Sequence, residues 1–146
     1  MIRITRLTDY GIVLLSQMAM EPERRFNAPD LAAETRLPQP MVSKILKMLA
    51  RSGLLLSHRG VHGGYSLARP AEQIDMAQII TALEGPIAVT ECNEDLPGSC
   101  LQEASCPVRG NWLRINRAIR DALAEITLAE MSRPASLRLV SLGGRR

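Results

Sequence analysis

All three cysteines of this 146-residue chain lie in one short segment, ECNEDLPGSCLQEASCPVRGNW, residues 91–112. Seven residues separate Cys92 from Cys100, and five separate Cys100 from Cys106. An odd number of thiols cannot all pair as disulfides, and clustered thiols in a reducing compartment more often serve metal or redox chemistry. The segment is therefore the first place to look for chemistry.

Three kinds of chemistry can use these thiols. The spacing differs from the paired C-x-x-C of a zinc ribbon, and the two histidines lie far upstream. A reactive thiol switch favours neighbouring cations, but acids surround these cysteines and Arg109 is the only nearby base. An iron-sulfur cluster uses thiolates, and iron displaces the thiol protons. The segment favours a cluster, either 2Fe-2S or 4Fe-4S, with zinc and bare thiols as alternatives. Three thiolates would need a fourth ligand from elsewhere.

The charge of the chain divides it into three parts. Residues 1–70 carry ten Lys and Arg against five acids, residues 71–106 carry seven acids and no Lys or Arg, and residues 107–146 carry eight Arg against three acids. Such a division indicates a polyanion-binding part next to a part with another task. The length and 46% hydrophobic content suit about one domain. No long apolar run occurs and the start is polar, so we expect a cytoplasmic protein without a membrane segment.

The first half of the chain predicts three helices. The first covers about residues 8–20, with Thr8 as its cap, and the second is a short helix capped by Asn27. Pro40 opens the third, which ends near Gly53. Their inward faces are predicted to hold Tyr10, Val13, Leu14 and Met18, then Leu31 and Ala32, then Val42, Ile45, Leu46 and Leu49.

The second and third helices have the order of a helix-turn-helix, in which the later helix enters the major groove. Its exposed positions are polar or basic, and we expect DNA contacts from Gln39, Ser43, Lys44 and Lys47. The next stretch, LLLSHRGVHGGYSLARP, predicts a β-hairpin with a glycine-rich turn, typical of a wing. Arg59 suits the narrow minor groove and His62 a phosphate or groove contact. An ordinary surface hairpin is the alternative.

Two further helices are expected. One covers residues 74–84 and stops at Gly85 and Pro86. The other covers 109–131, with an apolar seam of the coiled-coil type, which favours a homodimer suited to palindromic operators, although it could instead pack on its own domain. The seam consists of Trp112, Ile115, Ile119, Ala122, Ile126 and Ala129.

The predicted fold is thus mainly α: a winged helix-turn-helix with a two-stranded β wing, a cysteine loop and a long C-terminal dimerisation helix. The boundaries are 1–84 for the DNA-binding region, 85–108 for the cysteine loop, 109–131 for the dimerisation helix and 132–146 for a flexible tail. No constellation of His, Ser or carboxylates has catalytic spacing, so we expect neither an enzyme nor a small-molecule substrate.

The order of LTDYGIVLL, LAAETRLPQPMVSKILKMLARSGLL, RGVHGGYSLARP and a three-cysteine loop resembles the Rrf2 family of bacterial regulators over residues 1 to about 131. Within it, the chain is similar to the iron-sulfur branch, the IscR-like and NsrR-like proteins. The segments TEC, NWLRINRAIRDAL and TLAEM resemble regulators of the SUF iron-sulfur assembly system. The resemblance implies a homodimeric winged-helix repressor or activator whose DNA affinity depends on a cluster.

The resemblance also bears on the fourth ligand. IscR-like proteins have a histidine three residues after the last cysteine, where this chain has Arg109, which stays protonated and cannot bind iron. NsrR-like proteins use an aspartate of the first helix, donated across the dimer, and the LTDYG element has Asp9 there. The resemblance therefore implies Cys92, Cys100, Cys106 and Asp9. A helix-capping role for Asp9 is equally compatible, and Glu91, Glu94, Asp95 or Glu103 could substitute.

The sequence thus favours a cluster-dependent DNA-binding regulator, expected to be a repressor, of iron-sulfur assembly genes. One alternative is a regulator that senses nitric oxide or thiol oxidation with no role in cluster assembly. A module that stores or transfers a cluster without binding DNA is another, but it leaves the basic third helix and Arg59 unexplained.

Overall fold

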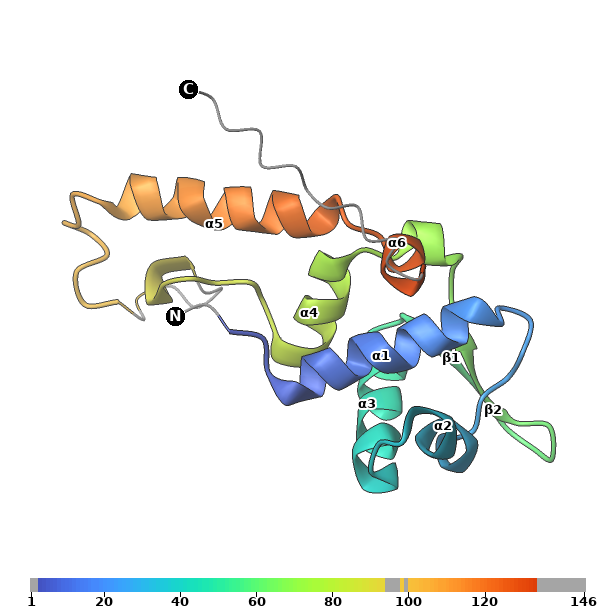
Figure 1. Ribbon diagram of the computed structural model, residues 1–146. Helices are drawn as coiled ribbons and strands as arrows, with labels where there is room; N and C mark the ends of the chain where they lie inside the picture. Colours follow the sequence, from blue (N-terminus) through green and yellow to red (C-terminus); the bar gives the residue numbers. More distant parts are fainter. Residues whose placement is uncertain (1–2, 94–97, 99, 134–146) are drawn as a thin grey trace.

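The computed structural model describes residues 3–93, 98 and 100–133, and within them the chain is mainly helical with one two-stranded sheet (Figure 1). Residues 134–146 of the predicted tail, together with Glu94 and Asp95, lie outside this part, whereas residues 132 and 133 are described. The elements in order are α1 (Arg6–Met20), α2 (Ala28–Thr35), α3 (Gln39–Arg51), β1 (Leu55–His58), β2 (Gly64–Leu67), η1 (Ala71–Gln73), α4 (Met76–Glu84), η2 (Glu91–Asn93), α5 (Arg109–Ala124) and α6 (Leu128–Ser132).

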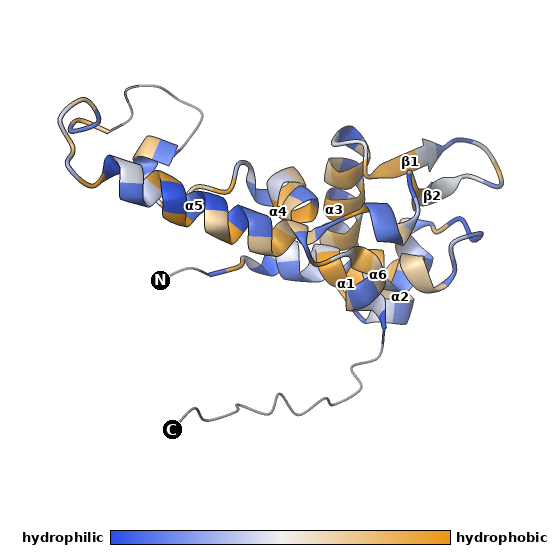
Figure 2. Ribbon diagram, turned by 90° about the horizontal axis from the view of Figure 1, so that it is seen from above, coloured by the Kyte–Doolittle hydropathy of each residue, from blue (hydrophilic) through white to orange (hydrophobic). Residues whose placement is uncertain are grey.

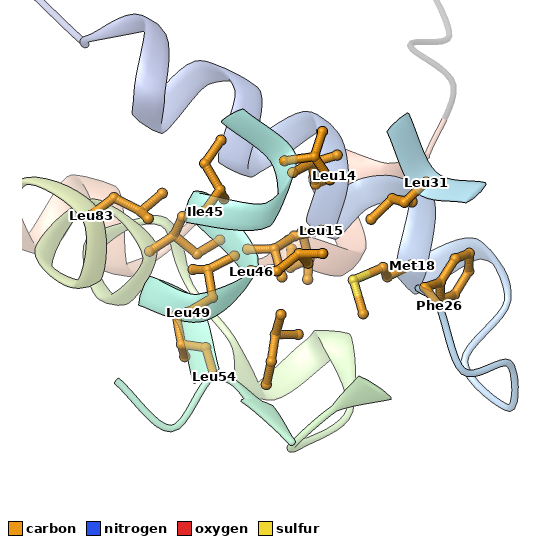
Figure 3. Close-up of a cluster of buried hydrophobic side chains, with 14 of the residues drawn as sticks. Leu14, Leu15, Met18, Phe26, Leu31, Ile45, Leu46, Leu49, Leu54 and Leu83 are labelled. Carbon is orange, nitrogen blue, oxygen red and sulfur yellow. The ribbon is translucent and has the colours of Figure 1, made fainter. Parts of the chain in front are cut away.

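The hydrophobic core lies where α1, α3 and α4 meet (Figure 3). The apolar stripe predicted for the third helix is confirmed, because all four of its members are buried. Gly11 lets α4 approach α1 closely, since a Cβ there would collide with the side chain of Leu83. The core residues drawn and labelled in Figure 3 are Leu14, Leu15, Met18, Phe26, Leu31, Ile45, Leu46, Leu49, Leu54 and Leu83.

Helix α1 starts earlier than predicted. Thr5, not Thr8, is its cap, and the Thr5 hydroxyl accepts a hydrogen bond from the Thr8 backbone N–H at 3.3 Å. Thr8 itself is buried, whereas Val13, which we predicted to face the core, is 42% exposed. The inward face is completed by Leu15 instead. The Thr5 backbone N–H and hydroxyl also donate to Glu84 at the end of α4, a contact that the local sequence does not reveal.

The turn between α2 and α3 follows the helix-turn-helix pattern. Asn27 caps α2 as predicted, since its Oδ1 accepts from the Asp30 N–H at 2.8 Å. Arg36 follows the last residue of α2 as its C-cap. Its φ of 57° puts it in the left-handed region that usually favours glycine or asparagine. This reversal allows α3 to begin three residues later, at Gln39, with Pro40 in its first turn.

The predicted hairpin is confirmed as an antiparallel pair, β1 with β2, in which Leu55 faces Leu67 and His58 faces Gly64. A third segment supports it, because Phe26 pairs with Tyr65 through two backbone hydrogen bonds of 2.9 and 2.7 Å. Gly64 has a φ of 134°, and a Cβ there would lie 2.6 Å from the Phe26 carbonyl oxygen. Only glycine fits this close approach.

The predicted single helix over 109–131 is wrong. Helix α5 ends at Ala124, and α6 begins at Leu128 after a connection that pairs with the start of α4. Thr127 and Glu130 form a capping box that starts the new helix. The break turns α6 onto α1, where Leu128 is fully buried. The seam therefore ends within α5, because Ile126 lies in the connection and Ala129 in α6.

Candidate nucleic-acid interface and cysteine segment

Helix α3 presents a basic, polar face away from the core. Gln39, Lys44 and Lys47 are exposed and Ser43 is half-buried. Ser43, Lys44, Lys47 and Arg51 line a shallow groove along this face, and its lining includes no acidic side chain. In Figure 1, α2, α3 and the wing lie on the side of the molecule opposite α5. The face has the charge and the helical geometry that major-groove binding requires.

The turn of the wing exposes Arg59, Val61 and His62, with Val61 almost entirely in solvent. The turn is held from outside the hairpin, since Arg25 Nη1 donates to the His62 carbonyl oxygen at 3.2 Å. We did not predict a role for Arg25 from the sequence. Its partner lies 37 residues away, so no local pattern could have revealed the contact.

Arg24 and Arg25 are neighbours in sequence with different surroundings. Arg24 forms ion pairs with Glu21 and Glu34 and stacks on the Phe26 ring, 4.4 Å from its centroid. The hydrogen bond from Arg24 lowers the pKa of the Glu34 carboxyl despite the opposing effect of its desolvation. Arg24 is therefore engaged with Glu34 of α2, whereas Arg25 is exposed and hydrogen-bonded to the wing turn.

Cys92 lies in η2, just before residues 94–97, and it is half-buried. Its Sγ is 3.1 Å from Thr90 Oγ1. The same Thr90 oxygen accepts a hydrogen bond of 2.7 Å from the Asn93 side-chain amide. Thr90 thus contacts the thiol of Cys92, the first of the three cysteines predicted as ligands.

Glu103, which lies between Cys100 and Cys106, forms an ion pair with Arg109. Glu103 Oε1 lies 2.7 Å from Arg109 Nη2, and Glu103 Oε2 accepts from the Gly98 backbone N–H at 2.9 Å. Both carboxylate oxygens of Glu103 are therefore engaged, which makes it a poorer substitute ligand than the sequence suggested. Arg109, at the position of the IscR-like histidine, is the first residue of α5, so its ion pair with Glu103 connects the cysteine segment to this helix.

The donor types fit an iron-sulfur cluster: three free, half-buried thiols in one segment. Among the described residues, however, no group of three or more His, Cys, Asp or Glu side chains lies close enough together to hold a metal ion. Asp9 is exposed on α1, and within the described part of the chain no hydrogen bond joins its side chain to the cysteine segment. The described part of the chain thus contains three free thiols that suit a cluster, but it does not bring them together with Asp9 into one site.

Asn116 lies in α5 next to the residues of the apolar seam, and no role was predicted for it from the sequence. It is only 7% exposed. Its Oδ1 accepts from the Val89 N–H at 3.0 Å, and its Nδ2 donates to the Ile87 carbonyl at 2.9 Å. Both partners lie 27 and 29 residues upstream, so no local pattern in the sequence could have revealed these contacts.

Helix α5 leaves apolar side chains uncovered along its length. Leu113 and Ile115 are 46% and 43% exposed, and Figure 2 shows apolar positions alternating with hydrophilic ones along the helix. Among the described residues, no helix is long and apolar enough to cross a membrane.

Comparison with known proteins shows which family this chain belongs to. Residues 4–134 match the Rrf2 family, described as iron-dependent transcriptional regulators. Protein rrf2 of Nitratidesulfovibrio vulgaris is 33% identical over 136 residues, which are 92% of this chain and 90% of that protein.

Two solved structures are similar throughout. CymR (YrzC), the global cysteine regulator of B. subtilis, is 26% identical with a TM-score of 0.67, over 90% of this chain and 97% of that one. IscR of T. potens is 25% identical with a TM-score of 0.65, over 89% and 85%. The helix-turn-helix, the wing and this match along nearly the whole chain lead to one conclusion: the chain belongs to the Rrf2 family of DNA-binding transcriptional regulators and is not an enzyme.

Proposed function

We propose that this protein is a homodimeric repressor of iron-sulfur cluster assembly genes whose operator affinity depends on an iron-sulfur cluster. The proposed ligands are Cys92, Cys100 and Cys106, with Asp9 donated from the other subunit. The observation that carries the proposal is the location of all three free thiols in one segment at the start of α5, remote from the DNA-binding face.

The proposed DNA contacts are Gln39, Ser43, Lys44 and Lys47 in the major groove, with Arg59 and His62 on the wing. All of these residues except the half-buried Ser43 are exposed, and this exposure and the basic face of α3 support the assignment. Lysine and arginine contacts to phosphate release counterions, so binding should weaken steeply as salt rises. The exposed apolar side chains of α5 support a dimer, which matches two-fold symmetric operators.

When bound, a cluster would supply metal–ligand bonds that hold the three cysteines together and that oxidants can break. Holding these cysteines in one place would order the acidic segment against α5 and the first helix of the partner. That order would fix the spacing of the two α3 helices in the dimer, and its loss would shift the population away from the DNA-binding form.

The test is anaerobic purification with iron and sulfide counted per chain, followed by gel-shift titration on operator fragments selected from a random-sequence library. We expect the wild-type protein to contain an iron-sulfur cluster and to bind the operator with an affinity that depends on it. Cys92→Ala, Cys106→Ala and Asp9→Ala should each lose both properties. Glu23→Ala, which removes another exposed acid, is the control and should retain the cluster. If Asp9→Ala keeps a full cluster, the fourth-ligand assignment is wrong.

A second candidate is regulation by thiol oxidation or nitric oxide without a role in cluster assembly. It is favoured by one observation, the three half-buried free thiols that the described residues do not gather into a metal site. It predicts that metal-free protein binds the operator with an affinity that changes on oxidation. The cluster proposal predicts instead that chelation of iron under argon changes the affinity with all thiols still reduced.

A further inference from the structure

The segment that leads into Cys92 is hydrogen-bonded to α5 through the side chain of Asn116. Residues 85–90 follow the end of α4 and precede η2, and they form neither helix nor strand. Asn116 of α5 bonds this segment on both sides of Ala88, through the Val89 N–H and the Ile87 carbonyl. One buried amide thus satisfies a donor and an acceptor of a backbone that has no secondary structure to do so.

A continuous set of contacts runs from this amide to the first thiol. Thr90 follows Val89 directly, and its hydroxyl lies 3.1 Å from Cys92 Sγ. Asn93 is held to the same residue twice, through the Thr90 carbonyl at 2.9 Å and the Thr90 hydroxyl at 2.7 Å. The position of η2, and with it the Cys92 thiol, is therefore set relative to α5.

We propose that Asn116 is a positioning residue for Cys92 and couples the state of that thiol to α5. The exposed apolar face of α5 lies on the helix that carries the buried amide. A change at Cys92 that moves Thr90 would strain or break the Asn116 hydrogen bonds, and by linkage a change in α5 would alter the exposure of Cys92. The regulatory meaning of this coupling rests on the proposed function, whereas the coupling itself can be measured on the metal-free chain.

The first test uses full-length, metal-free protein under argon and measures the alkylation rate of each cysteine by iodoacetamide and mass spectrometry. Asn116→Leu keeps the size of the side chain and removes both hydrogen bonds. We expect the Cys92 rate to rise about tenfold, which corresponds to roughly 1.4 kcal/mol in local opening. Cys100 and Cys106 in the same sample should keep their rates.

Two variants provide the controls. Asn111→Leu makes the same change at an exposed position of α5 and should leave all three rates unchanged. Thr90→Val keeps the shape of the side chain and removes only the hydroxyl, so it should raise the Cys92 rate with the amide exchange of Val89 unchanged. An equal rise at all three cysteines in Asn116→Leu would indicate general destabilisation and would overturn the proposal.

The second test runs in the opposite direction. In a Cys100→Ala, Cys106→Ala background, alkylation of Cys92 should increase hydrogen exchange of residues 111–120 of α5, and the additional change Asn116→Leu should abolish that response. Unchanged exchange in α5 after alkylation would refute the coupling. Because no iron is present, this result does not depend on whether the wild-type protein holds a cluster, which the anaerobic iron and sulfide counts decide separately.

Discussion

The carboxylate of Glu84, at the end of α4, accepts hydrogen bonds from both the backbone N–H and the hydroxyl of Thr5, at 2.9 and 2.8 Å. Thr5 is the cap of α1, so the last residue of one helix secures the first turn of another 79 positions away. A carboxylate at this place also faces the positive end of the α1 dipole.

This contact predicts a pH dependence of stability. Burial raises the pKa of Glu84, and hydrogen bonds from Thr8 and Thr5 lower it by more, so the pKa lies below its ordinary value. A carboxyl with a lowered folded-state pKa stabilises the fold above its unfolded-state pKa, and the contribution disappears as pH falls through the folded-state pKa. Glu84→Gln should therefore be less stable than wild type at pH 7, with the difference closing in acid. Urea unfolding between pH 7 and pH 3 measures this, and a constant difference would contradict it.

The packing of α6 on α1 predicts a large effect at Leu128. The side chain is fully buried, so Leu128→Ala should cost about 2–5 kcal/mol in free energy of unfolding. Met131 lies in the same helix but is 46% exposed, and Met131→Ala should change stability by no more than about 0.5 kcal/mol. Urea denaturation of both variants provides the comparison. Equal effects would show that α6 is not docked as described.

The wing predicts a contrast between two glycines. Gly64→Ala combines a φ of 134° with a Cβ 2.6 Å from the Phe26 carbonyl, so it should displace the hairpin from residue 26. Gly60 has a φ of 98° but open space around it, so Gly60→Ala should cost only the backbone strain, about 1–2 kcal/mol. Backbone NMR shifts of Tyr65 and Phe26 should move in the first variant and not in the second.

The face of α3 predicts the salt dependence of DNA binding. If Lys47 contacts a phosphate, Lys47→Gln should reduce the slope of log affinity against log salt by about 1, for specific and nonspecific DNA alike. Glu23 is exposed on the turn after α1, and Glu23→Gln should leave the slope unchanged. Fluorescence anisotropy at four salt concentrations measures both. An unchanged slope in Lys47→Gln would remove this residue from the interface.

Local patterns predicted the parts of the fold that depend on neighbouring residues. The Asn27 cap, the buried stripe from Val42 to Leu49 and the glycine turn of the wing each involve groups within a few positions of one another, so their chemistry is visible in the sequence. The capping hydrogen bond of Thr5 is equally local, but Thr5 and Thr8 are both residue types that suit a cap, and the contact that favours Thr5 comes from Glu84 in a distant helix.

The end of α5 is a different case. The capping-box pattern of Thr127 and Glu130 is local, but the prediction of one helix rested on the apolar seam alone. For the proposed ligands, the sequence shows only the residue types. The proposed site would join segments that are far apart in the chain or come from two subunits, so its geometry is not visible in the sequence. Asn116 was missed for the same reason, since its backbone partners lie 27 and 29 residues upstream.

The backbone pairing of Phe26 with Tyr65 has a consequence for the operator. It joins the wing to the segment that leads into α2, so main-chain hydrogen bonds tie the wing to the helix-turn-helix. If α3 reads base pairs and Arg59 reaches the minor groove, as proposed, this pairing constrains the spacing between the two contacts. One base pair inserted between those two elements of a half-site would shift them by about 3.4 Å along the helix axis, and the protein would have to give up one contact to keep the other.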